Sequence, residues 1–156
     1  MPFQERQMDL WSGIADGIAI AITTNGEVKQ NGEAIMGKGT ALQAKQRYPN
    51  IPRLLGYRLT RYGNHCHIFE SCQLTNGGIT DWSLISFPTK MWWRGKASLE
   101  LIESSARELM DLIEHNGWTT VYLPRPGTKN GGLDWLEVVT SGALDCLDER
   151  VVVVYQ

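Results

Sequence analysis

The stretch "GIAIAITTNG", from Gly17 to Gly26, decides the fold class of this chain. Its small and β-branched apolar residues predict a buried strand, and Asn25-Gly26 predicts the turn that ends it. A second apolar run, "RVVVVY" at residues 150–155, is typical of a strand that is covered on both faces. Because such strands occur in parallel sheets enclosed by helices, we expect an α/β protein.

Strands and helices alternate outward from these two runs. One expected helix begins in "MGKGTALQAKQRYP" and stops at Pro49. Three other expected helices cover residues 51–62, 99–117 and 134–147. The other expected strands cover residues 3–8, 66–71, 82–88 and 119–125, with a turn-rich segment at 75–81 and a small hairpin or loop at 27–35. This alternation predicts helices on both sides of a largely parallel sheet.

Composition excludes several classes of protein. The 156 residues fit one domain, and 42% hydrophobic with 21% charged residues is ordinary for a globular chain. The net charge of −2 lacks the basic excess of a protein held to nucleic acid by phosphate neutralisation. A local basic patch of Lys90, Arg94 and Lys96 stays compatible with this balance.

Cysteine usage and the N-terminus indicate the compartment. Three cysteines without CxxC spacing speak against a disulfide framework or a zinc site. His65 and His67 lack a third ligand, so we read them as structural or surface residues and expect neither a metal nor a cofactor. Without a signal peptide or a bilayer-length apolar segment, we expect a cytoplasmic protein that does not contact membranes.

Two glycine-rich loops follow predicted strands. In "MGKGTAL", residues 36–42, Gly37 and Gly39 allow close approach of a ligand, and the following helix start favours an anion such as a diphosphate. The alternative is a glycine turn that only starts a helix. In "PRPGTKNGGLDW", residues 124–135, Asp134 stands at the loop mouth, where helix capping and ligand chemistry are compatible roles. Together the loops could hold both ends of one extended phosphorylated ligand.

Lys90 lies in "FPTKMWWRGK", directly after a predicted strand that ends in Pro88. The cations Arg94 and Lys96, with partial burial by Trp92 and Trp93, would lower the pKa of its amine and favour the nucleophilic form. The alternative is an ordinary solvated surface lysine.

The order of these motifs resembles the macrodomain family of ADP-ribose-binding α/β modules. The most specific segment is "LISFPTKMWWRGKASLELIE", residues 84–103, which resembles the macrodomain of the DarG antitoxin, a DNA ADP-ribosyl glycohydrolase. Terminal ADP-ribose protein glycohydrolase belongs to the same branch. The resemblance implies one macrodomain over residues 1–156, folded as a three-layer α/β/α sandwich with a mixed, largely parallel sheet.

The resemblance also implies a function and a set of site residues. An ADP-ribosyl hydrolase would remove ADP-ribose from a nucleobase of DNA or from a protein acceptor, with Lys90 and Asp134 as the catalytic residues. Asp9 would contact the adenine amino group, and Asn25 or Asn31 would face a ribose. The ligand-binding positions that it implies are Asp9, Asn25, Asn31, Met36, Gly37, Lys38, Gly39, Thr40, Gly127, Thr128, Lys129, Asn130, Gly131, Gly132 and Leu133.

Two alternatives to this hydrolase stay open at the level of sequence. The second loop reads "GTKNGGL", where relatives usually carry a cysteine and another glycine. A non-catalytic module for ADP-ribose or an NAD-derived nucleotide, or a phosphatase for ADP-ribose 1″-phosphate, would fit the same motifs. Trp92, Trp93 and Arg94 are candidate contacts to single-stranded DNA, or they pack the loop of Lys90 onto the domain.

Overall fold

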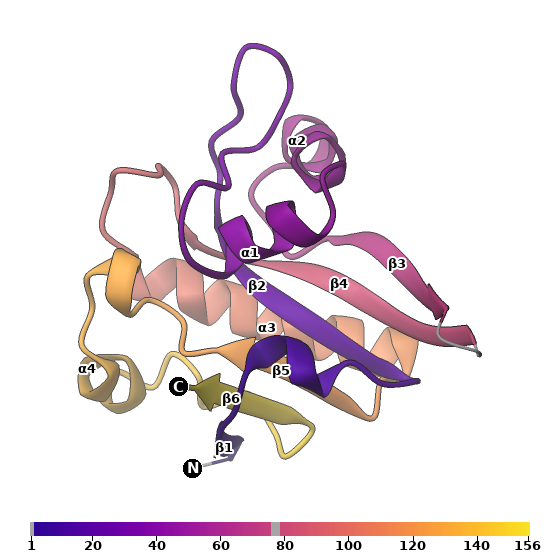
Figure 1. Ribbon diagram of the computed structural model, residues 1–156. Coiled ribbons are helices and arrows are strands. Elements are labelled where there is room, and N and C mark those ends of the chain that lie inside the picture. The colour runs from indigo at the N-terminus through magenta and orange to yellow at the C-terminus, as the bar shows by residue number, and fades with distance from the viewer. Residues whose placement is uncertain (1, 76–78) are drawn as a thin grey trace.

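A mixed six-stranded sheet forms the centre of the protein (Figure 1). The computed structural model describes residues 2–75 and 79–156. The strands are β1 (Gln4–Gln7), β2 (Ile18–Asn25), β3 (Ile68–Thr75), β4 (Ile79–Lys90), β5 (Thr120–Pro124) and β6 (Val151–Tyr155). They lie in the order β1-β6-β5-β2-β4-β3, and every neighbouring pair is parallel except β3 and β4. The predicted α/β class with a largely parallel sheet is therefore confirmed.

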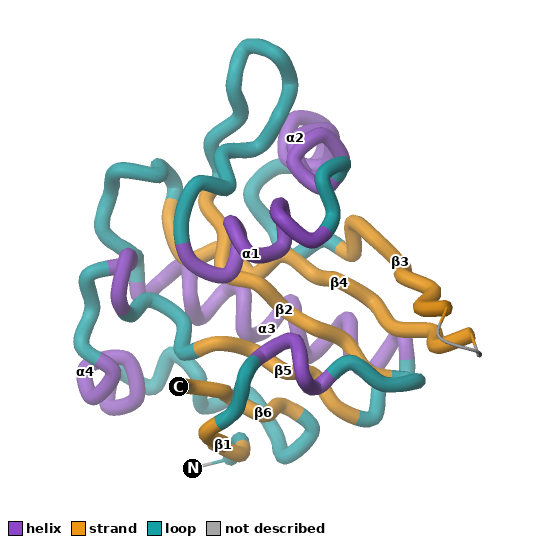
Figure 2. Tube along the Cα trace, viewed as in Figure 1, coloured by secondary structure: helices purple, strands orange, loops and turns teal. Residues whose placement is uncertain are grey.

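Helices cover both faces of this sheet, as Figure 2 shows. On one face lie α1 (Gly39–Arg47), α2 (Ile51–Tyr62) and the 3-10 turn η1 (Leu10–Gly13); on the other lie α3 (Leu99–Asn116) and α4 (Trp135–Thr140), which follows the 3-10 turn η2 (Lys129–Gly131). In β2, Ile18, Ile20 and Ile22 pack on the α1 side, while Ala19 and Ala21 pack on the α3 side. Alternate residues thus serve two cores, which explains the continuous apolar run.

The local sequence accounts for the boundaries of α3. The hydroxyl of Ser98 accepts the N–H of Leu101 at 3.2 Å, and Gly117 ends the helix with φ +70°. A left-handed residue after the last turn is a common helix terminator because it turns the chain away while satisfying a free carbonyl. The predicted helix is confirmed here, as is α2, whose observed bounds match the prediction.

Three predicted elements were wrong in extent. The strand expected at residues 66–71 is β3, which runs from Ile68 to Thr75. The fourth helix ends at Thr140 rather than Leu147, because Gly142 adopts φ +84° and residues 141–146 form turns. The fourth strand continues through Pro88 to Lys90. Pairing with β3 stops at Ile85, so at Pro88 the strand has only β2 beside it, and proline is tolerated at such an edge.

The connection at residues 27–35 folds back on itself. Val28 and Ala34 form an isolated antiparallel bridge, so this segment is a minimal hairpin. It packs against α2, where Ala34 donates its N–H to the carbonyl of Pro52 at 2.8 Å. Of the turn expected at residues 75–81, Thr75 belongs to β3 and residues 79–81 belong to β4, while residues 76–78 lie outside the described residues. No helix in the described part of the chain combines the length and apolar character needed to cross a bilayer.

Candidate ligand-binding site at the carboxyl ends of the strands

A cavity of about 740 Å³ opens where four parallel strands end. Its walls include Asn25 of β2, Lys90 of β4, Pro124 of β5 and Tyr155 of β6. These ends point to the same side of the sheet, at the left of Figure 1. Ligands of open α/β sheets bind at this edge, and the volume lies in the range of small-molecule sites.

The first glycine loop contributes a helix start to the cavity wall. Residues 36–41 line the cavity, and α1 begins at Gly39, which has φ +61°. Lys38 occupies the N-cap position of this helix, and its side chain makes no capping hydrogen bond. The first-turn N–H groups and the helix dipole are therefore available to an anion. Thr40 is held in place by Thr23, whose N–H donates to its hydroxyl at 3.3 Å.

The second glycine loop forms the opposite wall. Gly127 through Gly131 and Leu133 line the cavity, whereas Gly132 does not and lies beside the Lys96 side chain. The N–H of Leu133 donates to the carbonyl of Gly127 at 2.9 Å, which closes the loop on itself. Within the loop, Lys129 has φ +55°, a left-handed conformation that side-chain-bearing residues rarely adopt.

Lys90 is the last residue of β4, and its half-buried side chain lines the cavity. Its amine donates to the carbonyl of Trp93 at 3.2 Å. Burial lowers the pKa of this amine, and the positive charge of Lys38 lowers it further. The direction agrees with the sequence prediction, but the named cations were wrong: Lys38 across the cavity acts on Lys90, rather than Arg94 or Lys96.

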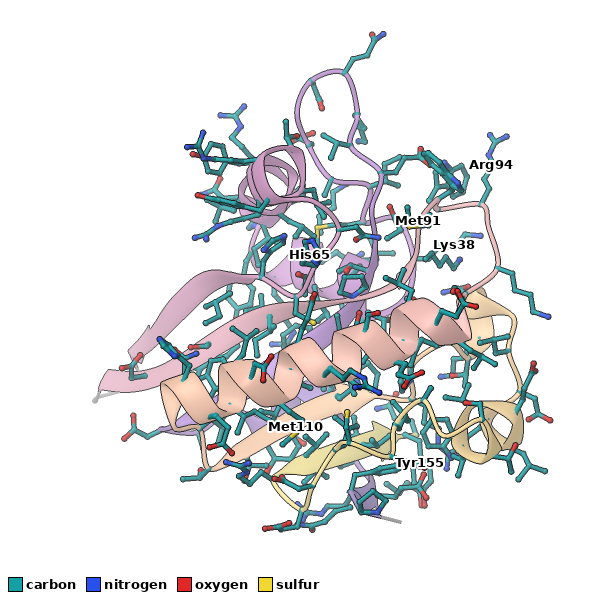
Figure 3. The ribbon with its side chains drawn as sticks, turned by 180° about the vertical axis from the view of Figure 1, so that it is seen from behind. Lys38, His65, Met91, Arg94, Met110 and Tyr155 are labelled. Atoms are coloured by element: carbon teal, nitrogen blue, oxygen red, sulfur yellow. The ribbon has the colours of Figure 1, made fainter. Side chains whose placement is uncertain are left out.

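Trp93 holds the loop after Lys90 against the first glycine loop. Its ring lies 5.9 Å from the Lys38 amine and 4.9 Å from the Arg94 guanidinium, measured to the ring centroid. Figure 3 shows Lys38 and Arg94 at the same end of the molecule. Of the three residues assigned to nucleic-acid contact, only Trp93 lines the cavity; Arg94 and Trp92 are exposed outside it, Trp92 by 64%.

Two aspartates project toward the cavity from helix starts. Asp9 occupies the N-cap of η1 and Asp134 the N-cap of α4, yet neither side chain makes a capping hydrogen bond. Both residues are exposed and line the cavity. The sequence allowed Asp134 both a capping and a ligand role; Asp134 does occupy the N-cap position, but its carboxylate makes no capping hydrogen bond and is left available to a ligand.

The structure separates the two candidate asparagines. Asn25 lines the cavity, although its amide also braces the loop by donating to the carbonyl of Ile35 at 3.0 Å. Asn31 lies in the exposed hairpin and bonds Glu33 through both its oxygen and its nitrogen. Asn31 is therefore outside the cavity, and of the two candidates only Asn25 lines it.

Comparisons with known proteins agree with this architecture. No family model matches the sequence. DNA ADP-ribosyl glycohydrolase of Mycobacterium tuberculosis is 34% identical over 110 residues, covering 67% of this chain and 29% of that protein. The protein of the same name from Thermus aquaticus is 30% identical over 137 residues, covering 81% and 35%. The chain thus spans about a third of the length of these curated relatives.

The solved macrodomain of Mycobacterium tuberculosis DarG superposes on the present structure with a TM-score of 0.72. The two are 29% identical, and the match covers 98% of this chain and 96% of that one. The chain is a macrodomain of the DarG-like branch.

Sequence reasoning missed one end of the macrodomain cavity. Arg125, Trp135 and Tyr155 all line it, and the Arg125 guanidinium lies over both rings, 5.1 Å from Trp135 and 4.1 Å from Tyr155. Glu5 accepts from the Trp135 indole at 3.0 Å and from Arg125 at 3.4 Å. The only sequence feature that could have indicated these three residues is their place in the chain, because each adjoins a predicted strand end or helix start.

Proposed function

We propose that this macrodomain binds ADP-ribose in the cavity and removes it from an acceptor, either a nucleobase of DNA or a protein side chain. The observation that carries this proposal is that one cavity brings together an amine with a lowered pKa, a carboxylate and two anion-binding loops. The curated relatives are named DNA ADP-ribosyl glycohydrolase, and this name supports the proposal, although the chain matches only about a third of their length. Residues 1–156 would act as one unit.

The cavity suggests an order for the parts of the ligand. At one end, the Asp9 carboxylate would accept from the adenine amino group beside the Tyr155 ring. In the middle, the first-turn amides of α1 and the second glycine loop would hold the diphosphate. At the other end, the distal ribose would lie against Asn25, Lys90 and Asp134. Binding would thereby align the C1″ carbon with the Lys90 amine.

Lys90 would supply the nucleophile. Its lowered pKa enlarges the neutral fraction, whose lone pair attacks C1″ while the bond from C1″ to the acceptor breaks and its electrons leave with the acceptor. The Asp134 carboxylate takes the proton that the amine loses and passes it to the departing acceptor. Water then cleaves the bond between the amine and C1″, which restores the enzyme.

A competing role for Lys90 is purely electrostatic, with the ammonium stabilising charge on the departing group. The two roles differ in one product, because a glycosylamine on Lys90 opens to an imine that borohydride reduces to a stable adduct. Mass spectrometry after borohydride treatment during turnover would locate this adduct on Lys90 in the covalent case and show none in the electrostatic case.

A panel of substrates tests the proposed function. Wild-type protein would be incubated with thymidine-linked and guanosine-linked ADP-ribosyl DNA and with glutamate-linked ADP-ribosyl protein, while calorimetry measures binding of free ADP-ribose. We expect release from at least one member. Tight binding without release from any member would instead indicate a non-catalytic module, and phosphate release from ADP-ribose 1″-phosphate would indicate a phosphatase.

For a DNA acceptor, the loop after Lys90 offers one exposed contact. We propose that Trp92 stacks on a base of a single strand, since its ring is largely free and aromatic stacking tolerates any base. Arg94 would lie near a phosphate, while its contact with Trp93 steadies the loop. Trp93 itself has the packing role, because Lys38 and Arg94 both lie against its ring.

A further inference from the structure

The solvent side of α2 carries a row of arginines and tyrosines that the ADP-ribose site does not use. We call Arg53, Tyr57, Arg58, Arg61 and Tyr62 the arginine–tyrosine face. The first, second and fourth of these recur at every fourth position, so they lie along one side of the helix. Tyr57 is 59% exposed and Tyr62 54%, which is unusual for large aromatic side chains.

No ion pair in the described part of the chain neutralises the positive charge of this face. α2 contains no acidic residue, and among the described residues none of its arginines forms an ion pair. Elsewhere Arg107, Arg125 and Arg150 each lie within 4 Å of a carboxylate. Three arginines without a carboxylate partner thus form a local concentration of positive charge on a chain of net charge −2, and one of them, Arg61, lies over the Tyr62 ring at 5.7 Å from its centroid.

The face also continues toward the mouth of the cavity. Six large apolar side chains are exposed in the described part of the chain; all except Leu136 lie on α2 or in the loop after Lys90, namely Leu54, Tyr57, Tyr62, Met91 and Trp92. Asn64, just beyond α2, joins the two segments by donating to the Lys90 carbonyl at 3.1 Å and lying 3.8 Å from the Met91 sulfur. In Figure 3, Met91 accordingly lies between His65, which follows Asn64, and Arg94.

We propose that the arginine–tyrosine face binds single-stranded DNA and holds the strand that flanks a modified nucleotide in the cavity. Exposed aromatic rings interleaved with arginines that lack a carboxylate partner match the chemistry of a single strand, whose bases stack and whose phosphates attract guanidinium groups. The contacts are to backbone and ring faces, so binding is tolerant of sequence. The choice of DNA as the strand rests on the proposed function; the surface itself does not require hydrolysis.

The test uses an unmodified strand, so that it is independent of catalysis. Fluorescence anisotropy would follow binding of a labelled oligothymidylate of about 15 nucleotides over a salt series. The double variant Arg53→Gln/Arg61→Gln would be compared with Arg6→Gln/Arg107→Gln, which removes the same charge from β1 and α3. Tyr62→Ala would be measured alongside, with calorimetry on free ADP-ribose for every protein.

We expect the α2 double variant to reduce the slope of log affinity against log salt by about 1.4, roughly 0.7 for each lost phosphate contact. Tyr62→Ala should weaken binding about tenfold. The control double variant should bind the strand as wild type does, and all four proteins should bind ADP-ribose equally. Equal losses in both double variants, or absence of strand binding by wild type at low salt, would each overturn the proposal.

If the substrate panel shows no hydrolysis while the α2 variants still lose strand binding, the proposed function fails and this surface stands. If ADP-ribosyl thymidine is hydrolysed while wild type does not bind the oligothymidylate, the proposed role of the arginine–tyrosine face is rejected and the proposed function stands.

Discussion

Lys90 combines two surroundings that act on its pKa in the same direction. Its amine is partly buried at the end of β4, and Lys38 adds a like charge from the facing glycine loop. Both effects disfavour the ammonium form, so the neutral amine becomes populated at a lower pH than for an ordinary lysine. The cleavage rate should therefore rise with pH and level off below the pH at which an ordinary lysine titrates.

Replacing Lys38 tests this electrostatic coupling. Lys38→Met removes the like charge, so the pKa of Lys90 should rise and the midpoint of the rate profile should move to higher pH, with a severalfold slower rate at neutral pH. Single-turnover rates at saturating substrate would separate this effect from weaker binding. Lys96→Met is the matched control, because Lys96 has no part in lowering the Lys90 pKa. Superimposable profiles for Lys38→Met and wild type would rule the coupling out.

Lys129 adopts a left-handed backbone conformation that glycine would adopt with less strain. Its left-handed backbone, φ +55°, lowers the free energy of unfolding by about 1 kcal/mol. A glycine would relieve this strain, but its unfolded chain has more conformational freedom, which lowers the free energy of unfolding by a similar amount. Lys129→Gly should consequently leave the free energy of unfolding nearly unchanged. Because Lys129 lines the cavity, losing its cation should weaken ADP-ribose binding severalfold in calorimetry at low salt.

Lys129→Gln serves as the control for that experiment, since it retains the strained backbone and removes only the charge. Both variants should lose a similar amount of affinity. Loss in the glycine variant alone would assign the effect to loop conformation instead of charge.

At the scale of elements, the end of β4 is fastened to α3 by one buried hydroxyl. Ser105 donates to the carbonyl of Pro88 at 2.6 Å, two residues before Lys90. Ser105→Ala would leave that carbonyl without its partner, at a cost of about 1–3 kcal/mol in the free energy of unfolding. Denaturant melts would measure it, with the exposed neighbour Ser104→Ala as the control that should lose nothing. Equal stability of the two variants would show that this hydrogen bond does not hold the strand end.

The packing of α2 on the hairpin at residues 27–35 depends on a missing side chain. A Cβ on Gly56 would lie 2.0 Å from the carbonyl oxygen of Gly32, so Gly56→Ala should destabilise the protein by about 3 kcal/mol. A Cβ on Gly37 meets nothing within 4 Å, and Gly37→Ala should melt as wild type does. A thermal melt of each variant checks both expectations, and an unaffected Gly56→Ala would refute the close approach of helix and hairpin.

Local sequence signals located the elements but misjudged the bounds of β3, β4 and α4. The apolar period of α3 and the glycine after α2 are properties of the segments themselves, so those boundaries could be predicted. The continuation of β4 through Pro88 depends on where its partner β3 stops pairing, and this is a property of the sheet. Likewise, the early end of α4 follows from the left-handed Gly142, which an apolar pattern does not reveal.

At the scale of the whole molecule, the sheet order determines which residues share the cavity. Both glycine loops and Lys90 could be predicted because each carries a local signal after an expected strand. Arg125, Trp135 and Tyr155 could not, since they meet only because β5 and β6 lie side by side with their carboxyl ends aligned. The same topology decides between Asn25, at the end of β2, and Asn31, out in the hairpin.

Lys90 is the residue that we expect to convert ADP-ribose binding into cleavage. The most direct measurement compares wild type with Lys90→Ala on the substrate that the panel identifies, in single turnover, with calorimetry on free ADP-ribose for both. Lys90→Ala should bind ADP-ribose with similar affinity but cleave it from its acceptor at least a hundredfold more slowly, the loss of about 2.7 kcal/mol expected for a catalytic group. Cleavage at the wild-type rate by a Lys90→Ala variant that still binds ADP-ribose would contradict this role of Lys90.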